Sequence, residues 1–291
     1  MNTAIIQARM GSTRLPGKIM YEVCGESLLS LMIKRIKNAK KLDKIIIATT
    51  INENDNVIVN FCKLNGIDFF RGSENDVLSR YYETSKKFPS DIIIRLTSDT
   101  PLLDPKTIDF IIEQYEKNDY DYVSNQFPFP RTYPDGTNVE VFSFNLLKEM
   151  YEKAKNPSDR EHVTTFVSMQ PKLFKIFRVD YPQDISKYRF NLDYDADYQL
   201  IKKVYEEFYF KNPHFTLEDI ISWLEKNPDI LKLNSDIKPY ENMIKSFSDD
   251  TKQNFKPHTK NYYLDNCLLY TSDAADDSLR VDLGGRRIIK K

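Results

Sequence analysis

Short apolar runs alternate with helix-length amphipathic segments over the first 125 residues, and this alternation constrains the fold most strongly. The apolar runs occupy residues 3–8, 44–49, 67–70, 91–96 and 121–123, and the helical periods occupy about 26–39, 54–64, 76–87 and 105–117. The run 44–49, KIIIAT, lacks polar alternation, which is typical of strands buried on both faces of a parallel sheet. We therefore predict right-handed βαβ units in an α/β fold with a three-layer, doubly wound, mostly parallel sheet.

The pattern changes after residue 125. A proline-rich turn region ends at Pro134-Asp135-Gly136, and the later periods predict an α+β second half that completes one side of a cleft. We predict strands at 139–144, 173–180 and 188–193, and helices at 144–154, 160–168, 197–209 and 216–226, the last opened by a capping box.

One domain is predicted over residues 1–230. Residues 231–266 are polar and Lys-rich with weak periodicity, which indicates a linker or the start of a truncated second domain. Residues 267–291 differ in composition, with three Arg, two Lys and a Gly pair, and we interpret them as a translated sequencing adapter that does not contribute to the fold or the function. A genuine polar tail is the alternative, and the continuation of the intact protein beyond Asn266 stays open.

Composition excludes several classes of function. Lys and Arg total 42 and Asp and Glu total 43, so the net charge of −1 gives no whole-chain attraction to nucleic acid or an anionic membrane. No apolar run approaches the roughly 18 residues of a membrane span, and the first residues lack the pattern of a secretory signal. Three Cys without metal-ligand spacing suit a reducing compartment. We expect a cytoplasmic protein with small-molecule partners, no nucleic acid and no membrane, and a homodimer stays open.

The loop at residues 7–18 follows the first predicted strand directly, where doubly wound sheets bind their ligands. It contains two glycines, two hydroxyls and three cations: Gly11, Gly17, Ser12, Thr13, Arg9, Arg14 and Lys18. Glycines allow backbone N–H groups to approach an anion, and cations neutralise it. The loop matches neither the Walker pattern nor GxGxxG. We predict a phosphate site here, with a tight turn bearing a solvated basic face as the alternative.

The same loop resembles the signature of the cytidylyltransferase family, which includes the enzymes that activate keto-deoxyoctulosonate and sialic acids. The nearest resemblance is to its spore-coat polysaccharide biosynthesis branch. Five further segments resemble that branch in order: RGSENDVLSRY at 71–81, RLTSDTPLLDP at 95–105, PDG at 134–136, DREH at 159–162 and RFNLD at 189–193. The resemblance covers about residues 1–225, and it implies the fold of nucleotide-diphospho-sugar transferases, CTP as substrate and Mg²⁺ as cofactor.

Two aspartates are candidate metal ligands. Asp99 follows a predicted buried strand, so its carboxylate faces the cleft and can hold Mg²⁺, although capping of the next helix is the alternative. The resemblance assigns the metal to Asp99 and Asp193. The simpler role for Asp197 is that of a negative charge at the start of a helix. Asp195 stands where the family often has Pro, a departure that could shift this loop.

The resemblance also implies roles for the remaining motif residues. Arg9 and Lys18 are candidate catalytic residues together with Asp99. The candidate nucleotide-binding residues are Ala8, Gly11, Ser12, Arg14, Ser73 and Asp76, and the candidate acceptor-binding residues are Arg131, Asp135, Glu140, Arg160 and His162. For His162 we leave open a general base, a substrate hydrogen bond or a structural role.

These observations favour transfer of CMP from CTP to a cell-surface carbohydrate precursor, with release of pyrophosphate. A sugar phosphate, a 2-keto acid sugar and a smaller polyol or acid phosphate all stay open as acceptors. The rival is a nucleotide-sugar-dependent glycosyltransferase of similar fold, in which acidic pairs hold Mn²⁺. The cationic loop argues against it, because a nucleotide-sugar donor has no third phosphate. A nucleotide-sensing subunit would need a lost signature residue, and none is missing.

Overall fold

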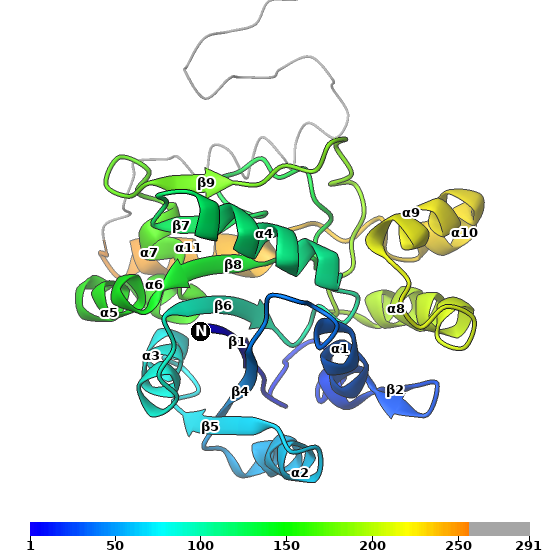
Figure 1. Ribbon diagram of the computed structural model, residues 1–291, viewed down its shortest axis with the longest axis horizontal. Coiled ribbons are helices and arrows are strands. Elements are labelled where there is room, and N and C mark those ends of the chain that lie inside the picture. The colour runs from blue at the N-terminus through cyan, green and yellow to red at the C-terminus, as the bar shows by residue number, and fades with distance from the viewer. Residues whose placement is uncertain (256–291) are drawn as a thin grey trace, which may run out of the picture.

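A seven-stranded sheet forms the middle layer of the computed structural model, which describes residues 1–255 (Figure 1). In spatial order its strands are β5 (Asp68–Gly72), β4 (Lys44–Thr50), β1 (Asn2–Gln7), β6 (Ile92–Thr97), β8 (Glu140–Ser143), β7 (Tyr122–Ser124) and β9 (Ile176–Arg178). Within this sheet only β8 runs antiparallel to its neighbours. The predicted doubly wound, mostly parallel α/β sheet is therefore confirmed.

Helices cover both faces of the sheet (Figure 1). One hydrophobic cluster contains side chains of α1 (Leu28–Ile36), α2 (Asn56–Leu64), α4 (Pro105–Lys117), α8 (Asp195–Phe208) and α9 (Leu217–Lys226). The other contains side chains of α3 (Val77–Lys87), α5 (Phe144–Lys153), α7 (Thr165–Ser168) and α11 (Glu241–Lys252). The central strand β1 sends Ala4 and Ile6 into the first cluster and Ile5 into the second, so it is buried on both faces, as its unbroken apolar run predicts.

Short elements complete the part of the chain that the structure describes. They are η1 (Lys18–Met20), the hairpin of β2 (Glu22–Val23) and β3 (Glu26–Ser27), η2 (Glu53–Asp55), α6 (Pro157–His162), α10 (Pro228–Leu231) and η3 (Lys232–Asn234). None of the helices within residues 1–255 is long and apolar enough to cross a membrane.

Three predictions for the second half are wrong in detail. Residues 188–193 form no strand, only a single bridge between Asp135 and Arg189, because the backbone N–H of Leu192 turns away to donate to the carbonyl of Asp99 at 2.9 Å. The helix predicted at 160–168 is divided into α6 and α7, since Val163 between them has a φ of 68°. The strand predicted at 173–180 shortens to β9.

The residues predicted as a linker are structured in part. Helix α11 lies within 231–266 and packs on α6, where the Ser158 N–H donates to the buried carboxylate of Asp250 at 3.2 Å. The interpretation as a linker is therefore wrong for α11, while the domain boundary at residue 230 stays a prediction. The end of that segment and residues 267–291, interpreted as a translated adapter, lie outside the described residues.

Gly136 allows two distant segments to approach each other. Its φ is 86°, and a Cβ built on it would lie 2.2 Å from the backbone N of Asn191 and 2.3 Å from the carbonyl carbon of Phe190. Only glycine fits this contact. The turn therefore brings Asp135 beside the loop that carries Asp193, at the carboxyl end of the sheet.

Candidate active site

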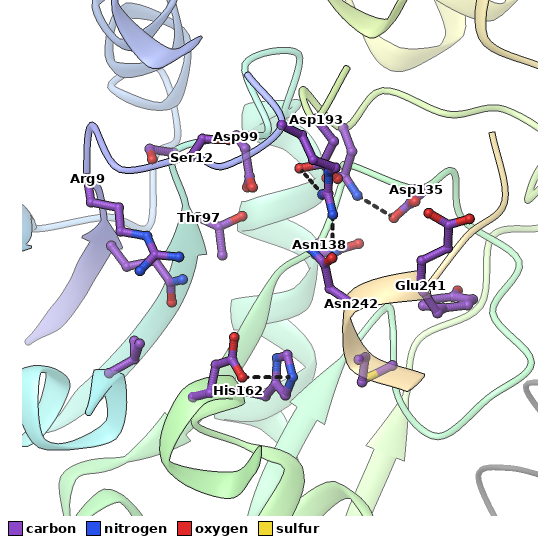
Figure 2. Close-up of a pocket in the computed structure, with 18 of the residues that line it drawn as sticks. Arg9, Ser12, Thr97, Asp99, Asp135, Asn138, His162, Asp193, Glu241 and Asn242 are labelled. Atoms are coloured by element: carbon purple, nitrogen blue, oxygen red, sulfur yellow. Dashed lines mark hydrogen bonds and ion pairs between the residues drawn. The ribbon is translucent and has the colours of Figure 1, made fainter. Parts of the chain in front are cut away.

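A cavity of about 580 Å³ opens beyond the carboxyl ends of β1 and β6, as expected for a doubly wound sheet (Figure 2). The structure brings predicted residues from all parts of the chain to its wall: Ala8, Arg9, Ser12, Arg14, Lys18, Asp99, Asp135, Glu140, His162 and Asp193. In Figure 2, Arg9 lies on one side, Asp193 and Asp135 lie on the other, and Thr97 and Asp99 lie between them.

Lys18 joins the two predicted metal ligands. Its Nζ lies 3.2 Å from Asp99 Oδ2 and 2.9 Å from Asp193 Oδ1. Lys18 opens η1 after Gly17, whose φ of 69° turns the loop back toward the sheet. Since both oxygens contact one nitrogen, the two carboxylates lie well within the 8 Å or so that still fits an empty magnesium site. The predicted meeting of Asp99 and Asp193 is confirmed, and the metal stays a prediction.

Asp193 is surrounded by cations. Besides Lys18, Arg14 Nη2 lies 2.8 Å from its Oδ1 and Arg189 Nη2 lies 3.1 Å from its Oδ2. Burial by itself would raise the pKa of Asp193, but these three cations outweigh it and hold that pKa at about 2. Burial likewise opposes the charge of Lys18, yet Asp99 and Asp193 raise the pKa of its ammonium group. Asp193 and Lys18 are therefore both charged at neutral pH.

The depressed pKa of Asp193 gives stability that depends on pH. An unfolded Asp has a pKa of about 3.9, so the contribution is complete above about pH 5 and is lost as the pH falls toward 2. We expect the difference in unfolding free energy between wild type and Asp193→Asn to shrink by about 2 kcal/mol between pH 7 and pH 2. Urea unfolding at several pH values measures it.

The matched control for this prediction is Asp195→Asn, because Asp195 is exposed in the first turn of α8. Its unfolding free energy should track wild type at every pH. A constant difference between wild type and Asp193→Asn would contradict the electrostatic account of Asp193.

Arg189 organises this side of the cavity. Its guanidinium donates to Asp135 at 2.8 Å, to Asp193 at 3.1 Å and to Asp197 at 2.9 Å. Asp197 is fully buried, and it also accepts the backbone N–H groups of Asp193 and Tyr194 at 3.0 Å. Asp197 thus caps α8, in agreement with its simpler predicted role. Arg189 was part of a quoted motif but received no role from the sequence.

Two hydrogen bonds hold the first part of the loop, one to Asp55 outside the loop and one within it. The Met10 N–H donates to Asp55 at 2.7 Å, and the Leu15 N–H donates to Ser12 Oγ at 3.2 Å. Arg9 is 45% exposed and lies 3.4 Å from Glu74. These hydrogen bonds hold the loop in shape, and the guanidinium of Arg9 is accessible.

Five predicted site residues do not line the cavity: Gly11, Ser73, Asp76, Arg131 and Arg160. Asp76 caps α3 by accepting the Ser79 N–H at 2.8 Å, and it accepts from Arg160 Nε at 3.0 Å. Ser73 Oγ accepts the Asp76 N–H at 3.0 Å. Arg131 is buried and donates to the carbonyl of Tyr133, while a Cβ on Gly11 would face Glu74 at 3.1 Å. These four side chains make contacts within the fold, and the binding roles predicted for all five residues stay predictions.

Glu140 and His162 both lie on the cavity wall but differ in their hydrogen bonding. Glu140 is buried and engaged by Arg95, by Thr164 and by the Tyr122 hydroxyl at 2.8 Å, so its carboxylate is saturated. His162 Nε2 is buried without a hydrogen-bond partner among residues 1–255, and burial lowers the pKa of its imidazole. The imidazole is therefore neutral at pH 7, and its Nε2 lies 3.9 Å from Glu161 Oε2 (Figure 2).

The sequence reasoning missed the contribution of α11. Asn242 accepts a hydrogen bond from Arg14, and Glu241 accepts one from the Tyr194 hydroxyl at 2.9 Å, so the start of this helix forms a wall of the cavity (Figure 2). Met243 also lines the cavity. The sequence around α11 is polar with weak periodicity. No motif in it indicates that Asn242 contacts Arg14, which lies 228 positions earlier in the sequence.

Comparison with known proteins settles the family. Residues 3–270 match the sequence profile of the cytidylyltransferase family. The chain belongs to the cytidylyltransferase family. This agrees with the resemblance carried by the motifs and with the cavity at the strand ends.

Three similar proteins match this chain over nearly their whole length. An uncharacterised protein of Methanocaldococcus jannaschii is 39% identical over 80% of this chain and 94% of its own. The spore coat polysaccharide biosynthesis protein SpsF of Bacillus subtilis is 33% identical over 77% of this chain and 94% of its own. The structure of a cytidylyltransferase from Leptospira borgpetersenii superposes with a TM-score of 0.75 at 35% identity, covering 79% of this chain and 96% of that one.

The donor set suits a hard cation held partly by substrate. Within residues 1–255, no three or more His, Cys, Asp or Glu side chains form a metal cage. Magnesium in nucleotide sites is commonly bound by one or two carboxylates together with phosphate oxygens and water. Asp99 and Asp193 offer that arrangement, and Asp99 is 32% exposed, so its oxygens can be reached from the cavity. These residues therefore fit Mg²⁺ in the presence of a nucleotide.

Proposed function

We propose that this enzyme transfers CMP from CTP to a carbohydrate precursor of a cell-surface polysaccharide, with release of pyrophosphate. The observation that carries the proposal is the meeting of Lys18, Asp99 and Asp193 at the edge of a cavity that also presents Arg9 and Arg14. A cationic loop beside two convergent carboxylates suits a triphosphate and its metal. A nucleotide sugar would leave part of this charge unused, so the glycosyltransferase alternative is less well supported.

The reaction needs positioning and charge neutralisation more than covalent catalysis. An acceptor oxygen attacks the α-phosphorus of CTP, the bond to the bridging oxygen breaks, and pyrophosphate leaves with that oxygen. Lys18 and Arg14 neutralise the negative charge that moves onto the leaving group, and Arg9 adds a third, more exposed cation. Ser12, whose hydroxyl lines the cavity, offers a donor to a phosphate oxygen.

Asp99 and Asp193 are the residues that would hold Mg²⁺. The ion would supply charge neutralisation of the phosphates and polarisation of the acceptor oxygen. The ammonium of Lys18 lies between the same two carboxylates. Lys18 therefore keeps the pair of carboxylates together.

The remaining wall is suited to a hydroxylated acceptor. Gln126, Asn138 and His162 offer hydrogen-bonding groups, and Tyr240 and Phe127 offer aromatic surface. Amides and a neutral imidazole pair well with hydroxyl groups, while aromatic faces pack on the C–H face of a sugar. The cytoplasmic location and the homodimer remain predictions.

Nucleotide binding tests the proposal first. We expect CTP with Mg²⁺ to raise the melting temperature, because ligand at about 100 times its Kd adds about 2.7 kcal/mol to the free energy of unfolding. The triphosphate should act through the cationic loop, so Arg14→Ala should reduce the shift. Differential scanning fluorimetry measures the melting temperature with CTP and with a nucleotide sugar, each in the presence and in the absence of Mg²⁺.

Two outcomes separate the candidate functions. A rise with CTP–Mg²⁺, followed by pyrophosphate release with one member of a panel of sugar acids and sugar phosphates, supports CMP transfer. A melting temperature that rises with a nucleotide sugar and stays unchanged at millimolar CTP–Mg²⁺ would favour the glycosyltransferase.

A further inference from the structure

A second cavity, of about 420 Å³, lies between α1, α8 and the loop that joins α8 to α9. These three helices belong to one hydrophobic cluster on the same side of the sheet (Figure 1). The second cavity shares no lining residue with the active-site cavity. Its wall combines aromatic and basic side chains, namely Tyr205, Tyr209, Phe215, Lys34, Arg35 and His214. The nucleotide site therefore does not account for it.

Arg35 places a buried positive charge at the wall of the second cavity. It is 5% exposed, and its Nη2 donates to the carbonyls of Phe215 at 3.2 Å and Leu102 at 3.5 Å. Its Nε is buried without a hydrogen-bond partner among residues 1–255. The buried Arg95 and Arg189, by contrast, pair with carboxylates. Because burying a charge without a counter-ion is costly, an anion bound in the cavity would stabilise Arg35.

The groups around Arg35 neutralise it only in part. Burial lowers the pKa of its guanidinium, and the carboxylate of Asp104 opposes that effect. Asp104, however, accepts the backbone N–H groups of Lys106 at 2.8 Å and Leu217 at 2.7 Å, so its oxygens are engaged at two helix starts. The ring of Phe215 covers one face of the guanidinium, with Cζ 3.8 Å from the ring centroid. This contact leaves the edge of the planar group for an anion.

The aromatic side chains give the second cavity an apolar wall. Tyr205 and Tyr209 lie one turn apart at the end of α8. The Tyr205 hydroxyl donates to the carbonyl of Pro101 at 2.6 Å, and the Tyr209 hydroxyl donates to Glu26. Since both hydroxyls are engaged, the rings are the parts that a ligand would contact. Such a wall suits a flat apolar group.

The charges at the rim limit the anion to a small one. Lys34 is largely exposed, and its Nζ pairs with Glu26 at 2.5 Å, so the charge of Lys34 is already balanced. No Asp or Glu of the described chain lines the second cavity. Arg35 therefore supplies its net charge, which matches a single carboxylate. A nucleotide triphosphate carries more negative charge than one arginine neutralises.

We propose that the second cavity binds a small aromatic carboxylate, at a site separate from the active site. The carboxylate would accept hydrogen bonds from the guanidinium of Arg35, whose planar shape matches it. The aromatic body would lie against Tyr205, Tyr209 and Phe215. Binding needs both parts of the ligand, because the charge alone has no apolar contact and the ring alone leaves Arg35 without a counter-ion.

Four variants test this assignment. Arg35→Met keeps much of the stem and removes the charge and the donors. His214→Glu adds a carboxylate at the exposed rim and leaves the contacts of Arg35 in place, so it tests the site even where Arg35→Met does not fold. Asn60→Glu makes the same charge change at an exposed position of α2 that lines neither cavity, and it is the matched control. Arg14→Ala removes a cation from the active-site cavity and reports binding there.

Isothermal titration with 2-naphthoate, acetate and 2-naphthalenemethanol separates the ring from the charge, and a melting curve of each variant checks the fold. We expect wild type to bind 2-naphthoate more tightly than either of the other two probes. The Kd of 2-naphthoate should rise about tenfold or more in Arg35→Met and severalfold in His214→Glu. It should stay unchanged in Asn60→Glu and Arg14→Ala.

Four results would overturn the proposal. They are no binding of 2-naphthoate to wild type at millimolar concentration, equal binding of the acid and the alcohol, and weaker binding in Arg14→Ala with none of that loss in His214→Glu. The fourth is an unchanged Kd in Arg35→Met with a lower melting temperature, which would make Arg35 a structural tie between α1 and the loop before α9. None of these results involves CTP, so the proposed function stands or falls separately.

Discussion

Lys18→Ala is expected to lower turnover by on the order of a hundredfold or more. Lys18 is buried and pre-placed at the cavity wall, where a positive charge stabilises the developing charge on the leaving group more than it stabilises bound CTP. The loss should therefore fall on kcat rather than on KM. Steady-state pyrophosphate release, with CTP varied at saturating acceptor, measures both parameters.

The fold should survive this change. Without Lys18, Asp193 keeps its contacts with Arg14 and Arg189, and Asp99 is partly exposed to water. Lys37→Ala, at an exposed position after α1, is the control and should leave turnover unchanged. Normal turnover in Lys18→Ala would contradict the role of the loop in phosphate transfer.

Asp99→Asn is expected to remove metal-dependent turnover, again by about a hundredfold or more, because metal ions supply several kcal/mol of transition-state stabilisation. The amide keeps the shape of the side chain and removes its charge. Asp99 suits this test, since Lys18 is its one side-chain partner among residues 1–255. Turnover measured over a range of Mg²⁺ concentrations should show a rate that no longer responds to the metal.

Two neighbours of the pair separate metal binding from folding. Asp197→Asn should reduce the melting temperature, because Asp197 is fully buried and bonded to Arg189. Asp195→Asn should change neither stability nor metal response, since Asp195 is exposed. If Asp99→Asn instead kept full Mg²⁺-dependent turnover, the metal assignment to Asp99 would be wrong.

The sequence predicted the fold and the centre of the candidate site because both depend on local patterns. Unbroken apolar runs determine parallel strands, and the carboxyl ends of such strands share one edge. Asp99 follows β6 directly, and the loop that carries Lys18 follows β1 directly, so strand order alone brings them close. Gly136 was recognisable as a turn, although its contact with Asn191 was not.

The other features depend on long-range contacts that no local pattern reports. Asp76 and Arg160 carry the charges expected of ligand-binding residues. They form an ion pair with each other across 84 positions of the sequence, and neither side chain lines the cavity. Arg35 lies within the helix predicted at 26–39, but the missing partner of its Nε is visible only in three dimensions. The start of α11 reaches the cavity because apolar residues such as Met243 pack into the core, and these are too widely spaced to predict it.

Diffraction from crystals soaked with CTP and Mn²⁺ tests the central claim most directly, because the ion has an anomalous signal and reports its own position. We expect one peak within about 2.0–2.3 Å of carboxylate oxygens of both Asp99 and Asp193, with the triphosphate on the loop of Arg9, Arg14 and Lys18. An ion bound away from these two carboxylates, or a triphosphate outside this cavity, would contradict the account.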